Sequence, residues 1–103
     1  MDEKLFRALA REAERRVNEF NAQNLANTAW AFATVGRSDA LLFAALMLAV
    51  MRRVGEFNAQ SLANTVWAFA TAGRSDVVLF LVLARAVEQQ LSDFNAQDVA
   101  NTA

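Results

Sequence analysis

A seventeen-residue segment, present twice in full and begun a third time, constrains the fold of this chain more than any other feature. The full copies are FNAQNLANTAWAFATVG, from Phe20 to Gly36, and FNAQSLANTVWAFATAG, from Phe57 to Gly73. The third begins as FNAQDVANTA at Phe94, so consecutive copies are 37 residues apart. A fixed period of about 20–50 residues is typical of repeat proteins, in which each unit buries its apolar side against its neighbours.

The residues within and between the copies predict helices. Apolar residues recur at intervals of three and four, which is the spacing of a helix with one buried side. Asn21 and Asn58 precede two of these segments as N-caps, and Gly36 and Gly73 follow them as residues that tolerate a left-handed backbone. The predicted helices cover residues 2–17, 22–35, 39–54, 59–72, 76–91 and, after Asn95 as the cap, 96–103.

The other helix boundaries are predicted from single residues. Ser38 and Ser75 are placed to cap the third and fifth helices, Gly55 to end the third, and Asn95 to begin the sixth. The apolar run at 77–84 would also suit a buried strand. Because it aligns with residues 40–47 one period earlier, we expect a helix there.

These elements predict an all-α fold, an α-solenoid of antiparallel helix pairs with a 37-residue repeat. We expect one domain, residues 1–103, of about 2.8 repeats at 1–37, 38–74 and 75–103, since the chain has 103 residues. The first helix has a charged outer side that suits the end of a stack, whereas residues 95–103 form only part of a unit. We therefore expect a piece of a longer array, which self-associates or frays from about Asp93 onward.

Composition limits the classes of function. The chain has no cysteine and no histidine and a net charge of −1. No nucleophile–base pair or metal cluster can be assembled from its residue types, so we expect no enzyme and no cofactor. The longest uncharged run, Ala40 to Met51, is shorter than the roughly 18–20 residues that span a bilayer, so we expect no membrane segment.

The motif FNAQxLANTxWAFATxG resembles the core of the octotricopeptide repeat of organellar RNA-binding proteins. Related repeats precede the RAP domain and occur in FAST-kinase-like proteins. The resemblance covers nearly the whole chain. Many repeats of that family have proline where this chain has Ala22, Ala59 and Ala96, and the chain contains no RAP domain.

The resemblance implies binding of single-stranded RNA, with successive repeats meeting successive nucleotides. It also implies a role in RNA processing, stability or translation in a mitochondrion or chloroplast. In modular helical-repeat readers, a few side chains per repeat read one base. The alternative is a protein–protein interaction scaffold without RNA binding, because stacked helix pairs also form concave surfaces for peptides.

An uncharged polar stripe on the repeated helix is the first candidate RNA site. On a wheel at about 100° per residue the stripe is narrow and contains no charged side chain, unlike an ordinary solvated face, and its amides and hydroxyls can both donate and accept. The asparagines could instead hydrogen-bond between repeats, and the glutamines could serve the helix N-terminus. The stripe consists of Gln23, Asn27, Thr34, Gln60, Asn64, Thr71, Gln97 and Asn101.

Three further sets of residues are candidates. Asn24, Ser61 and Asp98 occupy one position that varies inside a near-constant segment, as a base-selecting position would, although early helix positions also accept any small polar residue. Trp30 and Trp67 could stack on bases, but large aromatic side chains mostly bury, which favours the core between repeats. Arg37 and Arg74 could meet phosphates or pair with helix C-termini.

Overall fold

Helices account for the whole of the regular structure in the computed structural model, which describes the backbone of residues 2–74 and 76–102 and the side chains of residues 2–74 and 76–93. No strand occurs in these ranges, so the expected all-α class and the helix at 77–84 are confirmed. None of the described helices combines the length and the apolar character needed to cross a membrane. The helices are α1 (Glu3–Arg16), α2 (Ala22–Thr34), α3 (Ala40–Arg52), α4 (Ala59–Thr71) and α5 (Val77–Thr102), with 3-10 turns η1 (Val17–Glu19) and η2 (Val54–Glu56).

Asparagine begins both repeated helices, as the sequence predicts. The Asn21 side chain accepts from the Asn24 backbone N–H at 2.7 Å, and the Asn24 side chain accepts in return from the Asn21 N–H at 3.2 Å. Asn58 accepts from the backbone N–H of Ser61 at 2.7 Å. Each bond satisfies an amide that the first helical turn leaves free.

The caps of α3 and α5 differ from those predicted. Asp39, and not Ser38, caps α3, accepting from the Leu42 N–H at 2.9 Å. A carboxylate is favoured over a hydroxyl there because the helix N-terminus carries partial positive charge. The Asp76 carboxylate accepts in the same way from the Leu79 N–H at 3.1 Å. The predicted cap Ser75 lies outside the described residues.

Glycine ends α2 and α4 but not α3. Gly36 and Gly73 have φ values of +73° and +70°. After Gly36, the Arg37 N–H reaches back to the Phe32 carbonyl at 2.8 Å, which is the Schellman pattern, and Gly73 is followed by the equivalent bond. The prediction that Gly55 ends α3 is wrong, since that helix ends at Arg52 and Gly55 lies within η2.

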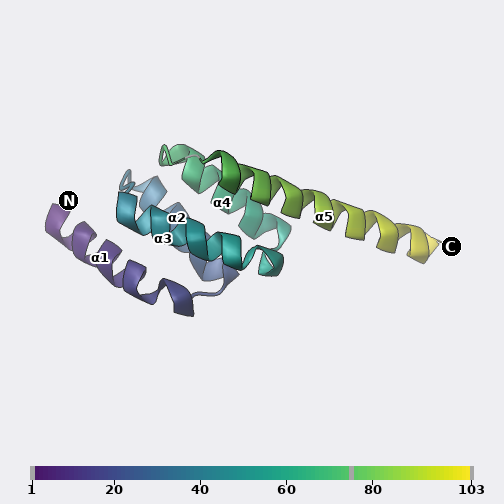
Figure 1. Cartoon of the computed structure of the whole chain (residues 1–103), viewed down its shortest axis with the longest axis horizontal. Helices are drawn as coiled ribbons and strands as arrows, with labels where there is room; N and C mark the ends of the chain where they lie inside the picture. The colour runs from purple at the N-terminus through teal and green to yellow at the C-terminus, as the bar shows by residue number, and fades with distance from the viewer. Residues whose placement is uncertain (1, 75, 103) are drawn as a thin grey trace.

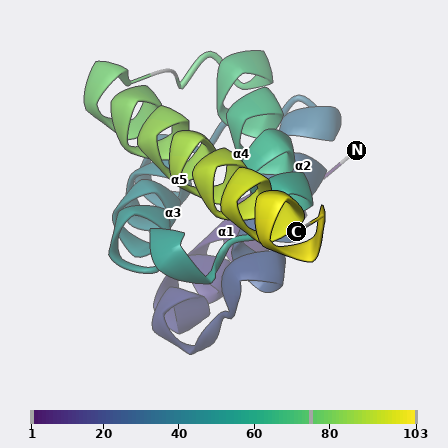
Figure 2. The same cartoon turned by 90° about the vertical axis from the view of Figure 1, so that its right-hand side faces the viewer.

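The helices form two layers. Figure 1 shows α1, α3 and α5 in front, in that order, with α2 and α4 behind them, and the termini at opposite ends. Figure 2, seen along the long axis, shows α2 and α4 on one side and α1 and α3 on the other. The α2 and α4 helices pack along each other, α3 packs on α1 and α2, and α5 packs mainly on α4.

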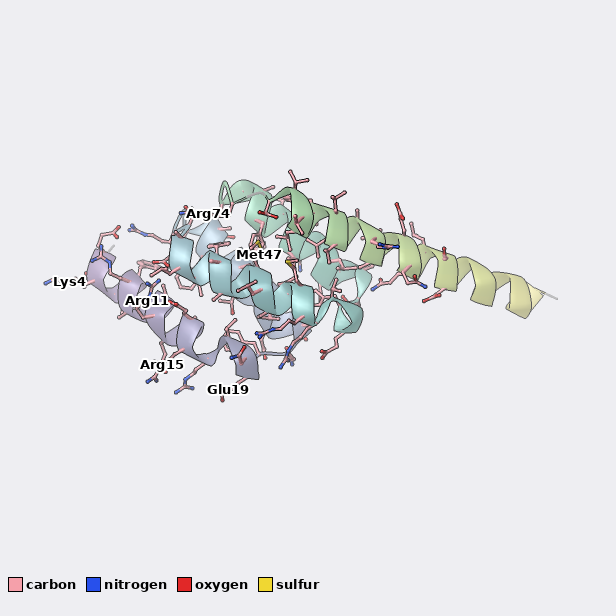
Figure 3. The ribbon with its side chains drawn as sticks, viewed as in Figure 1. Lys4, Arg11, Arg15, Glu19, Met47 and Arg74 are labelled. Carbon is pink, nitrogen blue, oxygen red and sulfur yellow. The ribbon has the colours of Figure 1, made fainter. Side chains whose placement is uncertain are left out.

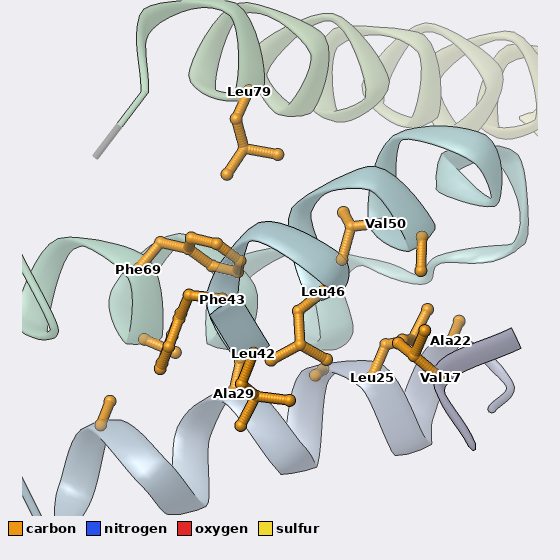
Figure 4. Packing of buried hydrophobic residues seen from close by; sticks show 14 of the residues in the cluster. Val17, Ala22, Leu25, Ala29, Leu42, Phe43, Leu46, Val50, Phe69 and Leu79 are labelled. Carbon is orange, nitrogen blue, oxygen red and sulfur yellow. The ribbon is translucent and has the colours of Figure 1, made fainter. Parts of the chain in front are cut away.

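The core lies where the two layers meet. Leu25 and Ala29 of α2 point toward Leu42 and Leu46 of α3, and all four side chains are fully buried (Figure 4). Phe43 of α3 meets Phe69 of α4 edge to face, with ring centroids 5.2 Å apart. The predicted apolar side of α2, which contains Leu25, Ala29, Phe32 and Ala33, therefore faces other helices, although Phe32 is only partly buried.

Each turn before a repeated helix is held by a side chain from the following copy. The Arg53 guanidinium donates to the backbone carbonyls of Phe20 and, at 2.8 Å, of Asn18. Gln90, one period after Arg53, donates to the carbonyl of Phe57. These bonds fix η1 and η2 because turn carbonyls without a helical partner need a donor.

The third copy does not form this turn. The predicted helix boundary at Asn95 is wrong, since α5 runs without a break from Val77 to Thr102 and extends past the other helices (Figure 1). Leu91-Ser92-Asp93 stands where the second copy has Val54-Gly55-Glu56. Propagating an existing helix adds one hydrogen bond per residue, whereas a new helix needs a costly nucleus. The helix therefore continues through Leu91-Ser92-Asp93, whereas the equally glycine-free Val17-Asn18-Glu19 of the first copy forms the turn η1, which the Arg53 side chain holds.

Candidate nucleic-acid interface

The predicted polar stripe and the two tryptophans occupy one side of α2 and the matching side of α4. Successive members lie four, three and four residues apart, which places them on one side of each helix. All are exposed except Asn64, which is half-buried. Because α2 and α4 pack along each other, the two sets lie side by side. This amide–tryptophan face consists of Gln23, Asn27, Trp30 and Thr34 on α2 and Gln60, Asn64, Trp67 and Thr71 on α4.

The two tryptophans contact each other at the surface. Their ring centroids are 6.2 Å apart with a 33° tilt, and Trp30 and Trp67 remain 47% and 46% exposed. The expectation that they belong to the core between repeats is wrong. Small side chains fill the contact between α2 and α4, so the helices approach closely and the indoles are left at the rim. The buried small residues are Ala22, Ala26, Ala29 and Ala33 on α2 and Ser61, Thr65 and Ala68 on α4.

The amides of this face are free for a ligand. The hydrogen bonds of the described side chains include none from Gln23, Asn27, Gln60 or Asn64. Helix capping is performed by Asn21 and Asn58 instead of the glutamines. Exposed amides next to exposed indoles can donate to and accept from a base whose ring stacks on the indole.

The position that varies between copies, Asn24 on α2 and Ser61 on α4, lies beside this face in the first turn of each helix. Asn24 completes the capping box of α2 and is exposed. Ser61 is only 7% exposed, and its carbonyl accepts from the Thr65 hydroxyl at 2.7 Å. Its side chain is therefore covered by neighbouring helices and has little surface to offer a base.

The two arginines lie at the same end of α2 and α4, directly after the helix-ending glycines. Arg37 pairs with Glu3 and lies 5.0 Å from the centre of the Phe6 ring. Arg74, labelled in Figure 3, donates to the Ser38 carbonyl at 2.6 Å. Each arginine contacts a residue about one period earlier, so both link neighbouring parts of the chain. Arg74 is exposed and Arg37 is half-buried.

The third set of candidates lies on α5. Gln97, Asp98 and Asn101 are in the helical segment 94–102, and their side chains are outside the described ones. Since α5 continues straight through this segment, its backbone does not follow that of α2 and α4. The structure therefore brings together two sets of the predicted stripe and not the third.

Further charged groups lie on α1. Figure 3 shows Lys4, Arg11 and Arg15 along α1, away from the paired helices α2 and α4. The pKa of Glu12 is lowered, chiefly by a hydrogen bond from Arg15; burial opposes this, and the charge of Arg15 together with the hydrogen bond and charge of Arg16 outweighs it. Among the described residues, no three acidic, histidine or cysteine side chains gather in a way that could hold a metal ion.

Two apolar grooves were not predicted from the sequence. One, of about 520 Å³, lies between α1 and α2 and is lined by residues that include Leu9, Phe20 and Ala31. The other, of about 680 Å³, lies between α4 and α5. The 37-residue repeat could have revealed these grooves. Most residues that line them have counterparts one period away that a neighbouring helix covers, and no described helix covers the grooves themselves.

One comparison with known proteins gave a match. A family model described as "Protein of unknown function (DUF1601)" matches residues 1–28, 41–66 and 82–102. The matched segments follow one another along the chain, and together they cover more than half of it. No curated protein and no solved structure matched the chain.

Proposed function

We propose that this chain, which belongs to the family described as "Protein of unknown function (DUF1601)", is a module that binds single-stranded RNA. The observation that carries the proposal is the amide–tryptophan face, an uncharged polar surface with two exposed indoles on neighbouring helices. The resemblance of the repeat to octotricopeptide repeats supports the choice of RNA as the ligand. No catalytic role or cofactor is part of the proposal.

The repeat determines how far the amide–tryptophan face extends along the molecule. We propose that α1–α2, α3–α4 and α5 are successive units of an α-solenoid with a 37-residue repeat. In such an array the second helices stand in a row, and each adds one tryptophan, two amides and one hydroxyl to a common surface. One nucleotide per unit then follows, as in other helical-repeat readers.

Stacking supplies the sequence-independent part of the binding energy. A base stacked on an aromatic side chain contributes about 1–3 kcal/mol, and every base offers a ring face. Trp30 and Trp67 are already exposed, so stacking requires no unfolding of the core. The amides at 23, 27, 60 and 64 supply hydrogen bonds to base edges, and Arg37 and Arg74 are the candidates for phosphate contact.

A protein-interaction scaffold is the second candidate function. The two apolar grooves and the net charge of −1 favour it, since both suit a polypeptide partner. The organellar role implied by the resemblance belongs to the RNA-binding proposal only. In that proposal the module acts in RNA processing, stability or translation.

Binding of RNA oligomers to single-site variants tests the proposal. Trp67→Ala and Trp30→Ala remove one stacking surface each, so each variant should bind a single-stranded RNA oligomer about 5–150-fold more weakly. The matched control is Leu48→Ala, which removes an apolar side chain of α3 that lies off the face and is slightly more exposed than the tryptophans. Affinity of Leu48→Ala should equal that of the unmodified chain. If all three variants bind alike, or if no oligomer binds, the proposal is wrong.

A further inference from the structure

The α4–α5 groove is the open version of a contact that is closed elsewhere in the chain. Ala59 and Ala63 of α4 line it together with Val87 and Leu91 of α5, and no charged residue is among the lining side chains. One period earlier, the matching residues are Ala22 and Ala26 of α2, Val50 of α3 and Val54 of η2. The first three of these are buried, whereas Ala59, Ala63, Val87 and Leu91 are all exposed.

The structure shows which segment covers the matching residues of α2 and α3. It is the turn and first half of α4, from Phe57 to Thr65, whose side chains Phe57, Ser61, Leu62 and Thr65 are at most 7% exposed. The same sequence pattern returns at 94–102, where Phe94, Asp98, Val99 and Thr102 stand at the matching positions. We call residues 94–102 the arm. The chain thus contains both the open α4–α5 groove and a second copy of the segment that fills the corresponding groove between α2 and α3.

The arm does not reach the groove of its own chain. To do so it would have to turn back at residues 91–94, as the chain turns at η1 and η2. Instead α5 continues straight into the arm, which projects beyond the other helices (Figure 1). A helix that replaces a hairpin turn carries its terminal segment away from its own fold, which is the geometry that permits domain swapping.

We propose that two copies of this chain form a symmetric dimer by exchanging arms, each arm filling the α4–α5 groove of the other copy. A two-fold axis across α5 near residues 91–94 makes the two α5 helices antiparallel. The incoming arm then runs opposite to the host's α5 and parallel to the host's α4. This is the direction that α4 takes when it packs along α2, so the exchanged contact repeats the internal one. The contact is the same on both copies, and therefore the assembly closes at two chains. This inference does not depend on RNA binding.

Position 98 distinguishes the exchanged contact from the internal one. Ser61 is buried against neighbouring helices, and the arm has Asp98 at that position. A carboxylate in an apolar groove opposes association because burial penalises the charged form. The dimer is therefore expected to be weaker than the internal contact implies, and Asp98→Ser should tighten it.

Sedimentation of the full chain over a range of concentrations tests the proposal. We expect a reversible equilibrium between monomer and dimer. Ala63→Arg places a charge in the groove and Val99→Asp places one on the arm, so each should raise the dissociation constant of the dimer by about 100-fold or more. The matched control is Ala8→Arg on the exposed side of α1, which should dimerise as the unmodified chain does.

A hinge variant separates arm exchange from any other dimer. Combining Leu91→Val, Ser92→Gly and Asp93→Glu restores the turn sequence of the second copy, so each arm should fold back and leave a monomer whose groove is filled. A chain that is monomeric at all concentrations, or that forms species larger than two chains, overturns the proposal. So does a dimer that Ala63→Arg weakens no more than Ala8→Arg, or that the hinge variant leaves intact.

Discussion

The first and second copies of the repeat have the same residue types at several matching positions but differ in the burial of these residues. Between α3 and α4 the residues Leu46, Thr65 and Ala68 are completely buried, because α2 fills the space that they line. Between α1 and α2 the matching residues are Leu9, Thr28 and Ala31, which line an open groove. Leu9 remains 48% exposed. The same residue types are therefore core or surface according to whether a preceding helix is present.

This difference teaches that one copy does not contain its own core. Each helix pair presents a groove on one side and, on the other, the small-residue side of its second helix. The core forms where the small residues of α2 enter the groove between α3 and α4. Stability in such an arrangement is approximately a sum of terms within copies and terms between neighbours. Position-matched variants in the two copies measure the neighbour term directly.

The largest expected difference concerns the alanine that faces the groove. Ala68→Arg should cost at least about 4 kcal/mol of unfolding free energy, since overpacking and an unpaired buried charge act together. Ala31→Arg, at the exposed matching position, should change stability by less than about 0.5 kcal/mol. Urea denaturation followed by circular dichroism measures both. Equal losses at the two sites would refute the difference in burial.

The leucines that line the two grooves should differ less. Leu46→Ala leaves a cavity in the core and should lower the unfolding free energy by about 2–5 kcal/mol. Leu9→Ala removes a half-exposed side chain, and its effect should be below about 1 kcal/mol. The midpoints of urea unfolding of the two variants decide the point. A loss at Leu9 as large as that at Leu46 would mean that α1 and α2 form a closed core by themselves.

The glycines that end α2 and α4 should behave alike in both copies. Gly36→Ala and Gly73→Ala each force a side chain into the left-handed region and should cost about 1–2 kcal/mol, although an added Cβ meets no atom within 4 Å at either site. Gly55 lacks a positive φ, so Gly55→Ala should be neutral or stabilise by about 0.4–1 kcal/mol. Thermal unfolding of the three variants gives the comparison. A loss at Gly55 equal to the others would place a strained turn there.

The smallest difference concerns the aspartates that cap α3 and α5. Burial opposes ionisation of Asp39, but hydrogen bonds from the Leu42 N–H and Arg11, with the charge of Arg11, outweigh it, so the pKa of Asp39 is lowered. The residue one period after Arg11 is Leu48, so Asp76 receives no equivalent arginine.

The lowered pKa gives this difference its pH dependence. A depressed pKa contributes stability above the unfolded pKa of about 3.9, and the contribution is lost as the pH falls through the folded pKa. Asp39→Asn should therefore cost up to about 1 kcal/mol at pH 6, and the cost should vanish in acid. Asp76→Asn should cost less at pH 6, since Asp76 receives no equivalent arginine. Unfolding measured between pH 6 and pH 3 tests this, and a pH-independent loss at Asp39 would contradict it.

The sequence alone predicted the helices that carry strong boundary residues. Asn21 and Asn58 at helix starts, and Gly36 and Gly73 at helix ends, were sufficient because caps and left-handed glycines act within a few residues. The break at Asn95 was predicted from the same local pattern and is wrong. That turn depends on contacts such as the one from Arg53 to Phe20, which come from residues far along the chain.

The candidate site was predicted in part. Helical spacing placed Gln23, Asn27 and Thr34 on one exposed side correctly. It could not place Trp30 and Trp67, because their exposure depends on how closely α2 and α4 approach. The sequence contains the small residues that permit this approach, but not the helix pairing that makes use of them. The grooves escaped notice for the same reason, since a single copy does not show which of its surfaces a neighbour covers.

The intrinsic fluorescence of the two tryptophans tests the proposed RNA site most directly. Trp30 and Trp67 are the only tryptophans of the chain, and both lie on the amide–tryptophan face. Titration with a single-stranded RNA oligomer should quench their emission in a saturable manner, because a stacked base contacts the indole ring. The quenching midpoint should equal the dissociation constant measured by an independent method. Saturable RNA binding with unchanged tryptophan emission, or no binding at all, would contradict the proposed interface.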